Sequence, residues 1–62
     1  MWIARDENGN LWVYENKPIR KSHTFHPLEM EETWTIINKD QYPEVTWENS
    51  PKELVVKEEE SV

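Results

Sequence analysis

The chain has 62 residues, with 13 acidic and 7 basic side chains, a formal net charge of −6 and no cysteine. The missing cysteine excludes disulfides and thiolate zinc sites, and the acidic excess disfavours nucleic-acid binding, which depends on lysine and arginine contacts to phosphate. No apolar run reaches the ~18 residues of a membrane span. The N-terminus also lacks the layout of a signal peptide, so we expect a cytoplasmic protein with no membrane partner.

The first fourteen residues predict a β-hairpin around the single glycine, Gly9. A two-residue Asn8-Gly9 turn would leave both faces of the hairpin mixed. A three-residue loop, with Asp6 at the first turn position and Gly9 as a left-handed G1 bulge, gives a more consistent register. That register pairs Trp2 with Tyr14, Ile3 with Val13, Ala4 with Trp12, and Arg5 with Leu11. We prefer it because it separates an aromatic face (Trp2, Ala4, Trp12, Tyr14) from an aliphatic face (Ile3, Leu11, Val13).

Residues 17–32 predict connecting structure. The polar stretch 22–27 has one apolar anchor, Phe25, so we expect a loop there. Residues 27–32 begin with proline and continue with good helix formers, which predicts a single helical turn. A small basic cluster lies just after the hairpin and consists of Lys17, Arg20 and Lys21.

Residues 33–37 form the best strand candidate after the hairpin. The sequence Thr-Trp-Thr-Ile-Ile is rich in β-branched and aromatic side chains. Alternation places Trp34 and Ile36 on one face and Ile37 with the two threonines on the other. We expect this strand to be the central one of the sheet.

Two shorter strands are expected near the C-terminus. Residues 45–47 alternate, which places Val45 and Trp47 on a shared face. Residues 54–56 read as an edge strand because charged side chains flank them. Turn-forming clusters at 38–41 and 48–51 separate these strands from each other and from the preceding one.

Together these elements predict a mainly β fold, a small antiparallel sheet or meander of four or five short strands with at most one helical turn. Such a sheet is either curled into an SH3-like barrel or left as a bent sheet. We expect a single domain over residues 1–57, followed by a disordered acidic tail over residues 58–62.

Patterns for catalysis or metal binding are weak. His23, His26 and Glu29 have the spacing of a three-ligand site on a helix, but Pro27 and the polar composition argue against a helix there. The serines lack a strand-to-helix nucleophile motif, and one glycine cannot build a phosphate-binding loop. We therefore expect no enzymatic activity, no bound metal and no cofactor.

Acidic and aromatic side chains are the remaining candidates for a binding surface. The candidate partner-binding residues are Glu44, Glu48, Glu53, Trp12, Tyr14 and Trp47, with Glu31 and Glu32 as further members of the acidic face. A plainer explanation is that the carboxylates keep a small β protein soluble. The aromatic rings are also needed for the core of so short a chain. The sequence therefore leaves open whether the aromatic face is buried or displayed.

Three sequence elements occur together in this chain: Asp6-x-Asn8-Gly9-x-Leu11, then Tyr14 with Lys17-Pro18-x-Arg20, then the stretch from Tyr42 to Pro51. This combination resembles small acidic hypothetical proteins of gut Bacteroidetes and of their phages or mobile elements. The resemblance covers both ends of the domain and skips its middle. It implies a bacterial or phage cytoplasmic protein and transfers no catalytic residues.

The leading functional hypothesis is a small interaction module that docks through its acidic face on a basic protein surface, which would steer association electrostatically. A second hypothesis is a phage-type inhibitor that mimics the charge of DNA, which would need carboxylates along a continuous ridge. A third is a homodimer through a sheet edge with a structural role, because the core of the chain is small. We thus expect a monomer or a weak homodimer.

Overall fold

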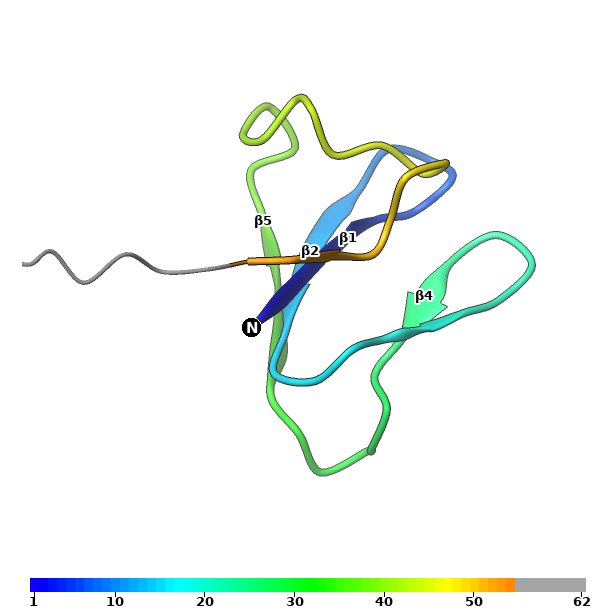
Figure 1. Cartoon of the computed structure of the whole chain (residues 1–62), viewed down its shortest axis with the longest axis vertical. Helices are drawn as coiled ribbons and strands as arrows, with labels where there is room; N and C mark the ends of the chain where they lie inside the picture. The colour runs from blue at the N-terminus through cyan, green and yellow to red at the C-terminus, as the bar shows by residue number, and fades with distance from the viewer. Residues whose placement is uncertain (55–62) are drawn as a thin grey trace, which may run out of the picture.

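A four-stranded antiparallel sheet forms the centre of the fold (Figure 1). The computed structural model describes residues 1–54. The sheet has the order β5-β2-β1-β6, and its strands are β5 (Trp34–Ile37), β2 (Leu11–Tyr14), β1 (Trp2–Arg5) and β6 (Lys52–Glu53). A second sheet of two short strands accompanies it. The expected mainly β fold is confirmed, and within residues 1–54 the four-stranded sheet is open, since β5 and β6 stand at opposite ends of the order.

The N-terminal hairpin has the three-residue loop that the sequence favours. The register of β1 and β2 pairs Trp2 with Tyr14 and Arg5 with Leu11. The Gly9 amide donates to the Asp6 carbonyl at 2.9 Å, and the Asp6 amide donates to the Asn10 carbonyl at 2.8 Å. Gly9 has a φ of 100°, as a G1 bulge requires. The predicted register is therefore confirmed at every pair.

Each face of the hairpin packs against its own cluster of side chains. The aliphatic cluster contains buried Ile3, Leu11 and Val45, with Val13, Ile37 and Leu54 packed against them. The aromatic cluster contains buried Ala4, Tyr14 and Phe25, with Trp2, Trp12 and Trp47 packed against them. The predicted separation of an aromatic from an aliphatic face is confirmed, and both faces are covered.

A second, short hairpin covers the aromatic face. Strands β3 (Ile19–Arg20) and β4 (Phe25–His26) pair antiparallel, and the Lys21 amide donates to the Thr24 carbonyl to close the turn between them. The expectation of a loop over residues 22–27 is wrong in part, because β4 lies within it. Phe25, the apolar anchor of this segment, is buried in the aromatic cluster and holds β4 beside the main sheet (Figure 1).

Strand β5 lies at the edge of the sheet, so the expectation that it would be central is wrong. It pairs only with β2 among the described strands, with Leu11 opposite Ile37 and Tyr14 opposite Trp34. The central positions are taken by β1 and β2, which the short hairpin turn joins at a small loop-closure cost. The composition of residues 33–37 describes a good strand but carries no information about its neighbours.

Residues 45–47 do not form the expected strand but lead into a turn at residues 47–49. The Thr46 amide donates to Asn49 Oδ1 at 2.8 Å, and the Asn49 amide donates to Thr46 Oγ1 at 3.1 Å. This reciprocal pair reverses the chain, so strand alternation does not apply. Val45 and Trp47 therefore do not share a face: Val45 enters the aliphatic cluster and Trp47 the aromatic one.

Residues 27–33 contain a single hydrogen-bonded turn, in which the Glu32 amide donates to the Glu29 carbonyl at 3.2 Å. The described part of the chain has no helix, and accordingly none long and apolar enough to cross a membrane. Strand β6, the last one among the described residues, begins before the expected residues 54–56. Residues 55 and 56 and the predicted tail 58–62 lie outside the described residues, so the boundary expected at residue 57 stays a prediction.

We expect Gly9→Val to lower the free energy of unfolding by about 1–2 kcal/mol, because a β-branched residue is strained at positive φ. No atom lies within 4 Å of an added Cβ, so the effect would come from the backbone alone. Urea unfolding measures it, and Gly9→Asn is the control with a smaller loss, since asparagine tolerates this region better. Equal stability of Gly9→Val and the wild type would contradict the bulge.

Candidate interaction surface

The three aromatic candidates are mostly packed inside the molecule. The Tyr14 ring is only 1% exposed, and its hydroxyl donates to the Phe25 carbonyl at 3.3 Å. Trp12 and Trp47 are half-buried, and Trp47 meets the Phe25 ring edge-on with centroids 5.4 Å apart. Tyr14 therefore offers no surface to a partner, whereas Trp12 and Trp47 each keep part of their surface accessible.

Arg20, which the sequence groups with Lys17 and Lys21 in a basic cluster, makes contacts within the molecule that stabilise the fold. Its guanidinium lies 3.9 Å from the centroid of the Trp47 ring and 5.1 Å from that of Phe25, which is cation–π geometry. Its Nη2 also donates to the carbonyl oxygens of Trp47 and Ser50, at 2.5 and 3.2 Å. These contacts hold residues 47–50 against the short hairpin, so Arg20 is committed within the molecule.

Asp6 joins the same hairpin to the N-terminal turn. Its carboxylate is 6% exposed and accepts hydrogen bonds from the Phe25 amide at 2.9 Å and from Trp12 Nε1 at 3.1 Å. The negative charge lies close to the Tyr14 hydroxyl. Burial first, and then the charges of Asp6 and Glu32, raise the pKa of Tyr14 well above its ordinary value of 10.0.

Arg5 holds the loop that carries part of the acidic face. All five N–H donors of its guanidinium find backbone carbonyl oxygens. The acceptors are Val45 at 2.5 Å, Gly9 at 2.8 Å, Lys39 at 3.0 Å, Tyr42 at 3.1 Å and Gln41 at 3.3 Å. The Arg5 amide donates to Ser50 Oγ at 2.9 Å as well. One side chain thus ties the segment between β5 and β6 to the hairpin turn.

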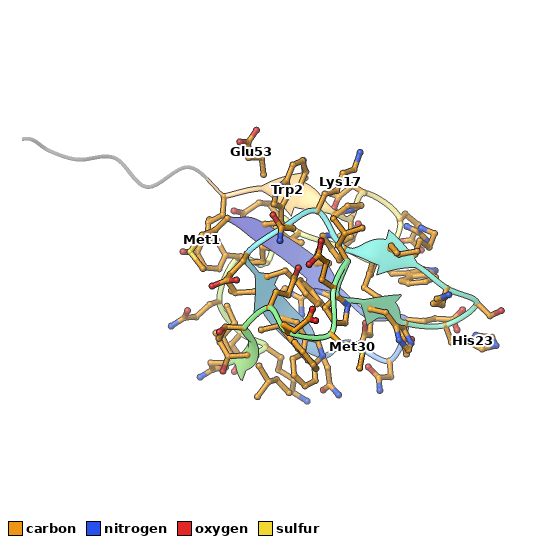
Figure 2. All side chains as sticks on the ribbon, turned by 90° about the horizontal axis from the view of Figure 1, so that it is seen from below. Met1, Trp2, Lys17, His23, Met30 and Glu53 are labelled. Carbon is orange, nitrogen blue, oxygen red and sulfur yellow. The ribbon has the colours of Figure 1, made fainter. Side chains whose placement is uncertain are left out.

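The exposed carboxylates of Glu44 and Glu48 stand on this anchored loop. Asn49 Nδ2 donates to the Glu44 carbonyl at 2.9 Å, which places both ends of the short turn in a fixed arrangement. Glu53 is exposed on β6 and projects away from the sheet (Figure 2). The three acidic candidates are therefore all at the surface, two of them on one hydrogen-bonded turn.

The two further acidic candidates differ from each other. Glu31 is exposed. Glu32 is only 8% exposed, because its Oε1 accepts from Asn16 Nδ2 at 2.9 Å and faces the Glu29 amide at 3.4 Å. Its Oε2 has no hydrogen-bond partner among the described residues. Glu32 therefore cannot contribute to an acidic docking face, and the expectation that it does is wrong.

The two histidines belong to the short hairpin of β3 and β4. His23 stands at the tip of the short hairpin (Figure 2), and its Nδ1 contacts the carboxylate of Glu7. His26 is exposed on β4. Within residues 1–54 no group of three metal-ligating side chains comes together, and the contact between His23 and Glu7 is the one ion-pair geometry found there. The same residues enclose no pocket.

Two exposed apolar side chains on β5 were missed as surface candidates. Trp34 is 37% exposed and Ile36 is 51% exposed, and both continue the aromatic face beyond β2. The assumption that residues 33–37 form the central strand concealed them. One sequence feature could have drawn attention to them: the stretch from Thr33 to Asn38 carries no charge, whereas the residues of β6 are charged.

We expect Arg5→Lys to lower the free energy of unfolding by about 2–4 kcal/mol, because lysine keeps the charge but cannot bond five separated carbonyls. Urea unfolding followed by tryptophan fluorescence measures the change. Arg20→Lys is the matched control and should cost less, since Arg20 bonds only two carbonyls. An Arg5→Lys variant as stable as the wild type would disprove the anchoring role.

The raised pKa of Tyr14 predicts a loss of stability in alkali. Above pH 10.0 an unfolded Tyr14 releases its proton while the folded one retains it, so the stabilisation present below that pH is lost as pH rises toward the folded pKa. The expected slope is about 1.4 kcal/mol per pH unit from this residue. Unfolding measured from pH 9 upward in Tyr14→Phe should lack this contribution, whereas Tyr42→Phe should keep it.

Comparison with known proteins identifies no relative: no family model, no curated protein and no solved structure matches the chain. The resemblance to small acidic Bacteroidetes and phage proteins accordingly stays a prediction. The functional argument therefore starts from the geometry described above, namely exposed carboxylates on an anchored loop and an uncharged sheet edge.

Proposed function

We propose that the chain is a small, non-enzymatic, cytoplasmic interaction module that docks on a basic protein surface through an acidic face made by Glu44, Glu48 and Glu53. The observation that carries the proposal is that all three carboxylates are exposed and none has an ion-pair partner among residues 1–54. Their charge is therefore available to an outside cation.

The arrangement of the positive charges supports this assignment. The guanidinium groups of Arg5 and Arg20 donate to backbone carbonyl oxygens, and neither forms an ion pair with a carboxylate among residues 1–54. The exposed cations among the side chains of residues 1–54 are Arg20 and four lysines, and the whole chain carries a net charge of −6. A surface of this kind raises the association rate with a basic partner and weakens as salt screens the charges.

The anchoring of the loop supports the same proposal. Glu44 and Glu48 are presented by a turn that Asn49 and Thr46 close, on a segment that Arg5 attaches to the hairpin. A pre-formed loop loses little conformational entropy when it binds, which favours affinity. The accessible part of Trp47, the residue before Glu48, would add apolar area near such a contact.

The test is affinity capture of the tagged chain from extract of its source organism, followed by a binding titration of the purified partner at low and high salt. We expect the affinity to fall steeply with salt. The triple variant Glu44→Gln, Glu48→Gln, Glu53→Gln should bind at least ~10-fold more weakly at low salt and lose most of the salt dependence.

Glu29→Gln serves as the control, since it removes an exposed carboxylate from the segment between β4 and β5 and should change the affinity little. Binding that is insensitive to salt and to the triple substitution would refute the acidic docking face. A captured DNA-binding protein that releases its DNA when the chain is added would instead support the DNA-mimic hypothesis.

A further inference from the structure

The two edges of the main sheet differ in their protection. The edge strand β6 consists of Lys52 and Glu53, and charged side chains discourage pairing with another strand. The edge strand β5 has the sequence Trp-Thr-Ile-Ile without a charge. An uncharged edge with β-branched and aromatic side chains is a template for strand addition.

The hairpin register shows which groups of β5 face outward. The Asp6 amide bonds the Asn10 carbonyl, and hydrogen-bonded pairs then alternate along β1 and β2, so Trp12 and Tyr14 bond toward β1. Leu11 and Val13 bond toward β5, where they oppose Ile37 and Thr35. The backbone groups of Trp34 and Ile36 consequently point to the free side of the sheet.

Side-chain exposure at this edge agrees with the backbone. Trp34 and Ile36 are exposed, and no backbone hydrogen bond outside the main sheet reaches either residue within the described region. The Ile36 carbonyl has only a 3.5 Å contact with the hydroxyl of Thr35. The same two residues therefore present unused backbone groups and uncovered apolar side chains.

We propose that the β5 edge pairs antiparallel with the β5 edge of a second copy of this chain, with Thr35 on the two-fold axis. Trp34 then lies opposite Ile36 of the other copy, twice per dimer, and these outward-facing pairs exchange four backbone hydrogen bonds. Each exposed apolar side chain is covered by one from the other copy. The two four-stranded sheets become one continuous sheet.

Competing registers are less favourable. Two antiparallel strands related by a two-fold axis pair residues whose side chains lie on the same face of the sheet. The axis must therefore pass through a residue, and each alternative register moves it to a neighbouring residue. With Trp34 on the axis, Ile36 opposes the carboxylate-bearing Glu32; with Ile36 on the axis, Trp34 opposes Asn38. Only the Thr35 axis pairs both apolar residues.

Charges beyond the strand favour the same register. Continuing the pairing outward, the acidic Glu31 of one copy approaches Lys39 of the other, and both side chains are exposed. The next residue, Asp40, is acidic, so the favourable charge pairing is limited to Glu31 and Lys39. This proposal does not depend on the acidic docking face, because it uses a different edge of the molecule.

Cross-linking tests the register, because the chain contains no cysteine. In the full-length chain, Thr35→Cys places two thiols at a non-hydrogen-bonded pair, where the Cα atoms are about 4.5 Å apart and a disulfide can form. Thr33→Cys is the matched control on the same edge, with its two copies separated by ~13 Å. We expect mild oxidation to give a covalent dimer with Thr35→Cys and little with Thr33→Cys.

Sedimentation of the cysteine-free chain gives a second measurement. Ile36→Lys should raise the dimer dissociation constant at least ~10-fold, because the apolar pair is lost twice. Ile19→Lys, at a side chain that is 42% exposed on β3, should leave it unchanged. Circular dichroism checks that both variants fold. Equal cross-linking of the two cysteine variants, or a wild type that stays monomeric at the concentrations used in NMR, would overturn the proposal.

Discussion

The five carbonyl bonds of the Arg5 guanidinium are the contact on which the rest of the structure depends. A chain of 62 residues without cysteine has a small core and no covalent cross-link. The irregular segment between β5 and β6 has few backbone partners of its own, and Arg5 supplies donors to four of its carbonyls and to Gly9. This contact brings Val45 over the aliphatic face, which would otherwise be open to water.

Asp6 performs the corresponding role on the opposite face. Side chains of consecutive residues in a strand point to opposite faces of a sheet. At the end of β1, Arg5 therefore contacts the segment between β5 and β6 on one face, and Asp6 contacts the short hairpin on the other. Asp6 binds the Phe25 amide and the Trp12 indole, which attaches the short hairpin to the aromatic face. One turn, shaped by Gly9, therefore positions an arginine for one layer and an aspartate for the other.

The sequence was sufficient for features set by local chemistry and insufficient for those set by distant partners. The register of the hairpin follows from Gly9 and from alternation over a few residues, and it was predicted correctly. The edge position of β5 depends on β1 pairing with β6, which residues 33–37 do not encode. The acidic residues were recognised, but the burial of Glu32 depends on Asn16, sixteen positions away. The exposure of Trp34 and Ile36 was not predicted either, because it follows from the edge position of β5.

The two proposed surfaces would respond to salt in opposite directions. A net charge of −6 makes two copies repel each other, so self-pairing of β5 would strengthen as salt screens that repulsion. Docking of the acidic face on a basic partner relies on attraction and would weaken under the same conditions. A basic partner that neutralises the carboxylates of Glu44 and Glu48 would also lower the repulsion between copies. Binding at the acidic loop would therefore promote pairing at the β5 edge without any change in the shape of the domain.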